Sequence, residues 1–155
     1  MRKLILSLPI LFAFLMVVSG CGKTAVDPTP TELLTKTWSV SVAKQDGTQV
    51  YQKGASTNID AGYANYKMTL GAASAATLVT KDNTSFSGTW ALSGADKVLT
   101  LSGLKNGAGQ NPTGTTGTII YDVQNTITAT AVTIQAQAKD LKAGNTTVNL
   151  QLVNP

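Results

Sequence analysis

The chain has few side chains that could perform chemistry. It contains no histidine, a single cysteine at position 21 and eight acidic residues. Because histidine is the commonest general base and metal ligand, neither a Ser–His nor a Cys–His nucleophile can form. The acids stand singly, and some occupy turn-like contexts such as Asp46-Gly47 and Asp82-Asn83, where aspartate commonly bonds its own backbone. We therefore predict no enzyme activity, no metal site and no cofactor, unless folding brings two carboxylates together as glycosidases require.

Cys21 ends a segment that has the three parts of a secretory signal. The chain begins with basic residues, residues 4–18 are apolar, and small residues precede the cysteine. Val18-Ser19-Gly20-Cys21 resembles the lipobox of bacterial lipoproteins. The resemblance implies that residues 1–20 are a signal peptide, and that Cys21 is cut free and lipidated with palmitate-type chains. The alternatives are an ordinary signal peptide with a coincidental cysteine, or an uncleaved anchor.

Residues 21–30 (CGKTAVDPTP) are predicted to be a flexible tether behind the lipid. They are small and polar and include two prolines, a composition that favours extended chain. Two or more acyl chains hold a protein firmly on a membrane. Gly22, rather than an aspartate, follows the cysteine. By resemblance to enterobacterial lipoproteins this favours the outer membrane, with the periplasmic or surface face left open.

The charge pattern argues against a nucleic-acid partner. Loss of Arg2 and Lys3 with the signal peptide takes the formal net charge from +4 to +2. No arginine follows residue 2, and the remaining lysines are scattered singly. Nucleic-acid binding needs clustered cations, with arginine for bidentate base contacts. We predict a membrane partner through the lipid anchor and no nucleic acid.

The body of the chain, residues 31–155, is predicted to be one all-β domain. Apart from a helical turn expected at 31–37 with Thr31 as its cap, no window shows a helical period. Period-two alternation recurs instead, as in strands with one face in a core and one in water. The alternating segments are 38–42, 66–70, 86–92, 119–123, 132–135 and 148–152, with weaker ones at 49–53, 76–80 and 98–102. Short connectors with turn residues favour an antiparallel meander of about eight to nine strands.

Two stretches resemble a known family. Residues 34–38 (LTKTW) are similar to the start of lipocalin-like domains, where a short helix closes the barrel base and a Trp opens the first strand. Residues 87–101 (SGTWALSGADKVLTL) resemble a hairpin of lipocalin-like lipoproteins of the Bacteroidota, in which a Gly-x-Trp strand turns into a Leu-Thr-Leu strand. The resemblance implies a lipocalin-like β-barrel over residues 31–155. An immunoglobulin-like β-sandwich is the alternative, because short alternating strands do not distinguish closed from open sheets.

Aromatic residues on the predicted inward faces are the candidates for ligand binding. Trp38, Tyr66, Trp90 and Tyr121 all fall on such faces. A mid-sized barrel can hold a small apolar ligand, although the same residues can simply fill the core. We therefore predict a membrane-anchored envelope lipoprotein that binds a small hydrophobic ligand. The alternative is a non-enzymatic structural or protein-interaction module, which an exposed apolar patch would favour.

Two long connections are predicted at 54–65 and 103–117. Both are rich in Gly, Asn, Ala and Thr, a composition typical of surface loops. In a barrel they could border an opening. Tyr51 and Tyr63, near loop or strand ends, could then lie on its rim or be exposed.

Overall fold

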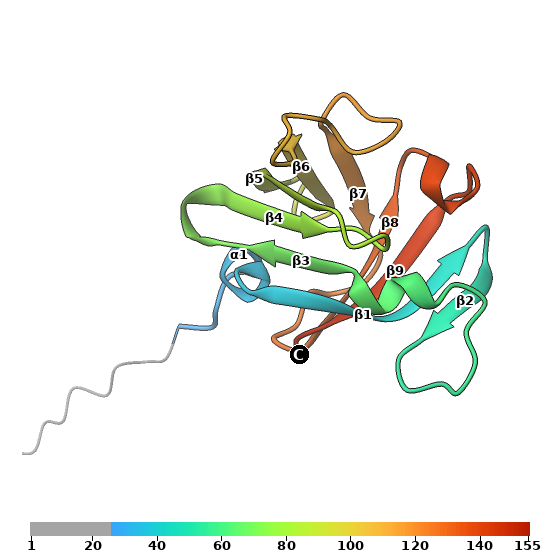
Figure 1. The fold of residues 1–155 in the computed structure, drawn as a ribbon. Coiled ribbons are helices and arrows are strands. Elements are labelled where there is room, and N and C mark those ends of the chain that lie inside the picture. Colours follow the sequence, from blue (N-terminus) through green and yellow to red (C-terminus); the bar gives the residue numbers. More distant parts are fainter. Residues whose placement is uncertain (1–25) are drawn as a thin grey trace, which may run out of the picture.

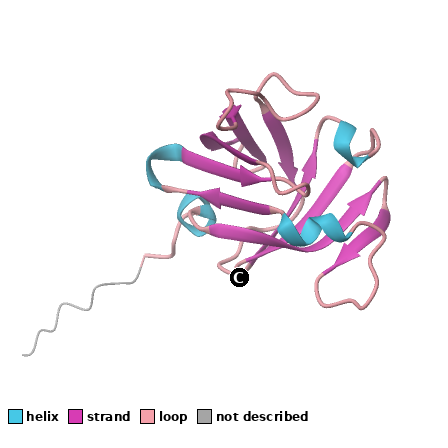
Figure 2. Cartoon of the chain, in the orientation of Figure 1, coloured by secondary structure: helices cyan, strands magenta, loops and turns pink. Residues whose placement is uncertain are grey.

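The computed structural model describes residues 26–155, which form strands and a few short helical elements (Figures 1 and 2). The predicted signal peptide (1–20) and the predicted lipid attachment at Cys21 lie outside the described residues. Among the described residues, no helix has the length and apolar character needed to cross a membrane.

The described chain is a succession of strands joined mostly by short connections, with longer ones between β2 and β3 and between β6 and β7. One short α-helix, α1 (Pro30–Leu34), precedes the strands. The strands are β1 (Thr37–Gln45), β2 (Thr48–Gln52), β3 (Lys67–Leu70), β4 (Ala75–Val79), β5 (Ser85–Ser93), β6 (Val98–Lys105), β7 (Ile119–Val123), β8 (Ala131–Ala136) and β9 (Val148–Val153). Three short 3₁₀ helices lie between them: η1 (Ala61–Asn65), η2 (Ala72–Ser74) and η3 (Leu141–Ala143). The predicted all-β class is confirmed.

The sheet is closed into a barrel. From β3 to β9 each strand pairs antiparallel with the next, and β9 pairs with β1 along residues 39–45. The other edge of β1 is shared by β3 near its beginning and by β2 near its end. Eight strands therefore form the ring, and β2 extends from it as a hairpin arm. This closure confirms the predicted antiparallel meander barrel and excludes the two open sheets of an immunoglobulin-like sandwich.

The alternating apolar residues point into the barrel and form one core. On β8, for example, Val132, Ile134 and Ala136 are buried while the residues between them are half-buried. The prediction is wrong at one place, because Val42 does not continue the inward face of Trp38 and Val40. A bulge in β1 between Val40 and Val42 shifts the pleat by one residue, so Ala43 points inward opposite Leu150 instead.

The helix before β1 begins earlier than the sequence predicted. Thr29, not Thr31, is its cap: the Thr29 hydroxyl accepts from the Glu32 backbone N–H at 3.3 Å. The Glu32 carboxylate in turn accepts from the Thr29 backbone N–H at 2.7 Å, which completes a capping box. Pro30 takes the first helical position, where its missing N–H leaves nothing unpaired.

Helix α1 packs at one end of the barrel and closes it. The Trp38 indole N–H, deep in the core, donates to the Leu34 carbonyl at 2.9 Å. The Lys36 ammonium lies 5.5 Å from the centre of the Trp38 ring and donates to the Ala129 carbonyl in the β7–β8 connection at 2.8 Å. These contacts join α1, β1 and the β7–β8 connection, so this end is filled by side chains. Any opening must lie at the other end.

The hairpin of β5 and β6 contains a close backbone approach at Gly88. Pairing shifts register between Ser87 and Thr89, whose partners on β6 are Lys105 and Ser102. A Cβ atom at Gly88 would lie only 2.4 Å from the Ser102 carbonyl oxygen. Because that obstacle is backbone, a side chain at position 88 forces the two strands apart.

Replacing Gly88 by alanine should therefore destabilise the barrel. We expect the free energy of unfolding in urea to fall by about 1–3 kcal/mol, the usual cost of forcing extra atoms into a packed interior. Gly107→Ala is the matched control, because its Cβ would meet nothing within 4 Å and its φ is not positive. Equal unfolding midpoints for the two variants would contradict the close approach.

Candidate functional site

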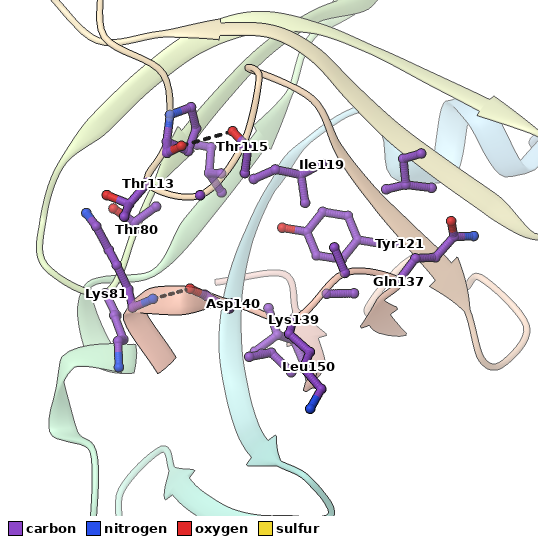
Figure 3. A pocket seen from close by; sticks show the side chains of 18 of the residues that line it. Thr80, Lys81, Thr113, Thr115, Ile119, Tyr121, Gln137, Lys139, Asp140 and Leu150 are labelled. Atoms are coloured by element: carbon purple, nitrogen blue, oxygen red, sulfur yellow. Dashed lines mark hydrogen bonds between the residues drawn. The ribbon is translucent and has the colours of Figure 1, made fainter. Parts of the chain in front are cut away.

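A cavity of about 420 Å³ lies at the end of the barrel away from α1 (Figure 3). Its mouth is formed by three connections that meet at this end: the β4–β5 turn, the β6–β7 loop and the β8–β9 segment with η3. Its walls are largely apolar and include Leu78, Ile119, Val148 and Leu150. Eight-stranded barrels are just wide enough to be filled by side chains or to hold one small ligand. Here Ala136, the inward residue at the end of β8, has a side chain too small to fill that space.

Two tyrosine hydroxyls are paired inside this end of the barrel. Tyr66, immediately before β3, and Tyr121, on β7, are both buried and both line the cavity. Their hydroxyl oxygens are 2.9 Å apart, and either can be the donor. Figure 3 shows the Tyr121 hydroxyl pointing into the space between the mouth segments. One hydroxyl proton is used within the pair. The hydroxyl proton of the second tyrosine has no acceptor within residues 26–155, which leaves one O–H group available to a ligand.

All four tyrosines of the chain form a continuous row. The ring centres of Tyr51 and Tyr63 are 6.3 Å apart, and those of Tyr63 and Tyr66 are also 6.3 Å apart. These separations are typical of tilted aromatic pairs. The Tyr63 hydroxyl accepts from the Gln45 side-chain amide at 3.1 Å. The row thus runs from the β2 arm through η1 to the cavity, where it meets Tyr121.

Burial changes the acidity of the phenols that line the cavity. Desolvation is the main cause for each, and it raises the pKa of Tyr63 and of Tyr121 to about 12. The pKa of Tyr66 is also raised well above its usual value, first by burial and then by charge interaction with Tyr121. The negative charge of Asp140 raises the pKa of all three. The phenols are therefore neutral hydrogen-bonding groups over the physiological pH range.

Asp140 brings a carboxylate to the cavity wall. It is half-buried and caps η3, where its Oδ1 accepts from the backbone N–H of Lys142 at 2.8 Å and of Ala143 at 3.3 Å. Figure 3 marks the bond that fastens this side chain to the start of η3. The cap gives the carboxylate a defined position on a short, rigid turn.

Two ion pairs connect the segments around the mouth. The Lys81 ammonium lies 2.5 Å from Asp60, joining the β4–β5 turn to η1. Lys142 pairs with Asp82, joining η3 to the same turn. Hydrogen bonds from Lys142 and then Thr80 hold the pKa of Asp82 well below its usual range. The β4–β5 turn is thereby held on two sides.

The mouth is also narrowed by a contact between two of its connections. Leu141 of η3 packs on Gly114 of the β6–β7 loop, where a Cβ would lie 2.7 Å from the Leu141 Cδ1. Gly114 also has a φ of +77°, a conformation that other residues rarely adopt. The loop and η3 therefore approach each other through a position that requires glycine.

The structure divides the predicted ligand-binding residues into two groups. It brings Tyr66 and Tyr121 together in the cavity wall. Trp38 and Trp90 lie outside the lining: Trp38 bonds to α1, and the Trp90 indole N–H donates to the Gly71 carbonyl at 2.9 Å. Both tryptophans are buried, and their N–H groups are used by backbone carbonyls on the closed side of the barrel.

The sequence did not single out Asp140, and it placed Tyr63 only provisionally on a rim. Tyr63 is buried and lines the cavity, and Tyr51 is buried against it. The long connection predicted at 54–65 ends in η1, which carries Tyr63. The one predicted at 103–117 begins with the last residues of β6, and its remainder supplies part of the mouth. The 103–117 connection thus borders the opening, whereas the 54–65 connection contributes the buried Tyr63 to the cavity wall. The only sequence feature that could have pointed to Asp140 is its position in the connection between the strands predicted at 132–135 and 148–152.

Comparison with known proteins finds a likeness among solved structures. No protein-family model matches the chain, and no curated protein matches it. Among solved structures, the chain is similar to a lipocalin-like protein from Bacteroides uniformis, with a TM-score of 0.47 and 13% sequence identity. The alignment covers 79% of this chain and 99% of that protein.

The raised phenol pKa values predict a loss of stability at alkaline pH. The folded state keeps Tyr63, Tyr66 and Tyr121 neutral, whereas the unfolded chain ionises them near pH 10. The stability that the neutral phenols contribute to the folded state is fully present below pH 10. It is lost as the pH rises toward their pKa values in the folded state, which are about 12 for Tyr63 and Tyr121. We expect the free energy of unfolding to fall by up to about 1.4 kcal/mol per pH unit for each phenol.

A variant with Tyr66→Phe and Tyr121→Phe isolates this effect, because all other titrating groups stay the same. Its free energy of unfolding, measured in urea at several pH values, should fall less steeply above pH 10 than that of the unaltered protein. Identical slopes would show that the two phenols are not held neutral by the fold.

Proposed function

We propose that the chain is a lipid-anchored envelope lipoprotein whose lipocalin-like barrel binds one small, mainly apolar ligand. The observation that carries the proposal is the cavity of about 420 Å³ with the Tyr66–Tyr121 hydroxyl pair in its wall. Its volume falls in the usual range of small-molecule sites, and such sites combine apolar walls with a few placed polar groups.

The lining suggests how a ligand would be held. The apolar walls favour an apolar body, since burying it releases water from both surfaces. The spare hydroxyl proton of the tyrosine pair would orient a hydrogen-bond acceptor on the ligand. A buried O–H group without an acceptor costs free energy. A ligand that supplies the acceptor removes this cost, which favours binding.

The proposed anchor joins the barrel at the end opposite the mouth. Residues 26–29 are exposed and lead into α1, which closes one end, while the cavity opens at the other. A lipid on Cys21 would therefore attach the closed end to the membrane. This arrangement lets the mouth face the aqueous side of the envelope.

The interaction-module alternative has less support. An exposed apolar patch beside the 54–65 connection would favour it, but that connection shows only Ile59, which is 79% exposed. The other exposed large apolar side chains among residues 26–155 are Val26, Ile120 and Leu141, each from a different element. Single exposed apolar residues are normal on a protein surface and mark no interface.

Filling the cavity should remove ligand binding. Ala136→Phe places a ring in the space beside Tyr121, whereas Ala91→Phe on the exposed face of β5 is the matched control. We expect native mass spectrometry of the full chain, extracted from its envelope in mild detergent, to show a retained small molecule. The Ala136→Phe variant should lose it and the Ala91→Phe variant should keep it.

A circular-dichroism melt of each variant shows whether the barrel still folds. Retention of the same molecule by a folded Ala136→Phe variant would place binding elsewhere. A bare protein mass in every preparation would contradict the expected retention of a ligand.

The proposed lipid anchor has its own test. In Cys21→Ser the sulfur that would carry the lipid is absent, so we expect no incorporation of labelled palmitate and release from the membrane fraction. The intact mass of the unaltered protein should correspond to residues 21–155 plus lipid. Equal membrane association and equal mass shift in the two proteins would contradict lipidation at this residue.

A further inference from the structure

One oxygen of the Asp140 carboxylate is free to meet a ligand. In residues 26–155 both hydrogen bonds to this side chain end on Oδ1, and Oδ2 accepts none. The side chain is half-buried and lines the cavity. A carboxylate removed from bulk water with an unused oxygen is a ready acceptor for a charged donor.

Three tyrosine rings line the same cavity as this carboxylate. They are Tyr63 from η1, Tyr66 before β3 and Tyr121 from β7. The Lys81 ammonium already lies 5.5 Å from the centre of the Tyr63 ring, so Tyr66 and Tyr121 are the rings without a lysine over them. Aromatic faces attract organic cations through their quadrupole, and the attraction is larger where water is excluded. An anionic group beside several aromatic rings is therefore a suitable environment for an ammonium ion with an apolar body.

Within residues 26–155 the Asp140 carboxylate has no ion-pair partner, whereas two lysines of the cavity lining are paired. Asp140 is the charged group that raises the pKa of all three tyrosines. Among the lysines of the lining, Lys81 is neutralised by Asp60 and Lys142 by Asp82. Lys139 makes no ion pair within residues 26–155, but it is exposed, where water and salt screen its charge. The half-buried Asp140 carboxylate is thus less exposed to water than Lys139 and, unlike Lys81 and Lys142, has no ion-pair partner in the described part of the chain.

We propose that the cavity ligand is a small organic ammonium ion, with its charged end on Asp140 and its apolar body against Tyr63, Tyr66 and Tyr121. This inference rests on the proposed ligand-binding function and specifies its ligand class. It also agrees with a mouth on the aqueous side, because such cations are soluble in water. The spare tyrosine proton can serve an acceptor atom at the far end of the same ligand.

The test compares three probes that share a hydroxyphenyl body and differ in charge: tyramine, tyrosol and hydroxyphenylacetate. Binding to the purified full chain is measured by titration calorimetry at neutral pH, with detergent alone as the blank. We expect tyramine to bind at least about tenfold more tightly than either of the other two, as loss of a charged hydrogen bond implies.

Asp140→Asn and Asp96→Asn form a matched pair of variants. Asn at position 140 keeps an Oδ1 that can cap η3 and removes the charge. Asp96 lies in the exposed β5–β6 turn at the opposite end, with a φ of +68° that asparagine tolerates. Tyramine affinity should fall about tenfold to a hundredfold in Asp140→Asn and stay unchanged in Asp96→Asn.

The outcomes separate this inference from the function on which it rests. If tyrosol or hydroxyphenylacetate binds as tightly as tyramine, the ammonium class is wrong while ligand binding stands. If a folded Asp140→Asn variant binds tyramine unchanged, the role of the carboxylate is wrong. If no probe binds, the inference fails, and together with a bare native mass this result also overturns the proposed function. The three-probe comparison uses the unaltered protein, so it stays decisive even if a variant does not fold.

Discussion

The pairing of β1 with β9 is the interaction on which the rest of the structure depends. It joins the first and last strands of the meander, so the ring has no unpaired edge and every alternating strand has a defined inside. The bulge after Val40 is part of this closure, because it bends β1 and moves Ala43 to the inside. Without that pairing the same apolar faces would form an open sheet with one side uncovered.

Closure makes a ring, and the connections make its two ends different. At one end α1 and the Trp38 indole fill the interior: the indole N–H donates to the Leu34 carbonyl of α1, and the Lys36 ammonium donates to the Ala129 carbonyl. At the other end the inward residues include the small Ala136, and the longer connections stand around the opening rather than inside it. Large aromatic side chains thus serve two purposes in one fold. The tryptophans belong to the filled part of the core, and the tyrosines combine core packing with a polar tip at the cavity.

At the open end of the barrel, the burial and pairing of each charged side chain matter more for the electrostatic environment than the number of charged side chains. The mouth has both signs of charge, and pairing between Lys81 and Asp60 and between Lys142 and Asp82 links its segments. Asp140 differs because its partners are backbone N–H groups, which leave its formal charge in place. Burial is the main reason that the pKa values of the three tyrosines are raised, and the charge of Asp140 adds to the rise in each.

The sequence by itself determined the all-β class, most of the inward faces and the antiparallel order, because period-two alternation and short turns are local properties. It also defined the lipobox-like segment at Cys21, which lies outside the described residues. Ring closure, the β1 bulge and the difference between Trp38 and Tyr66 were decided only by the tertiary structure. Tyr66 and Tyr121 are 55 residues apart along the chain, and Asp140 comes from a third segment. Alternation says which side of a strand a residue faces, whereas only the strand register and the connections say at which end of the barrel it lies.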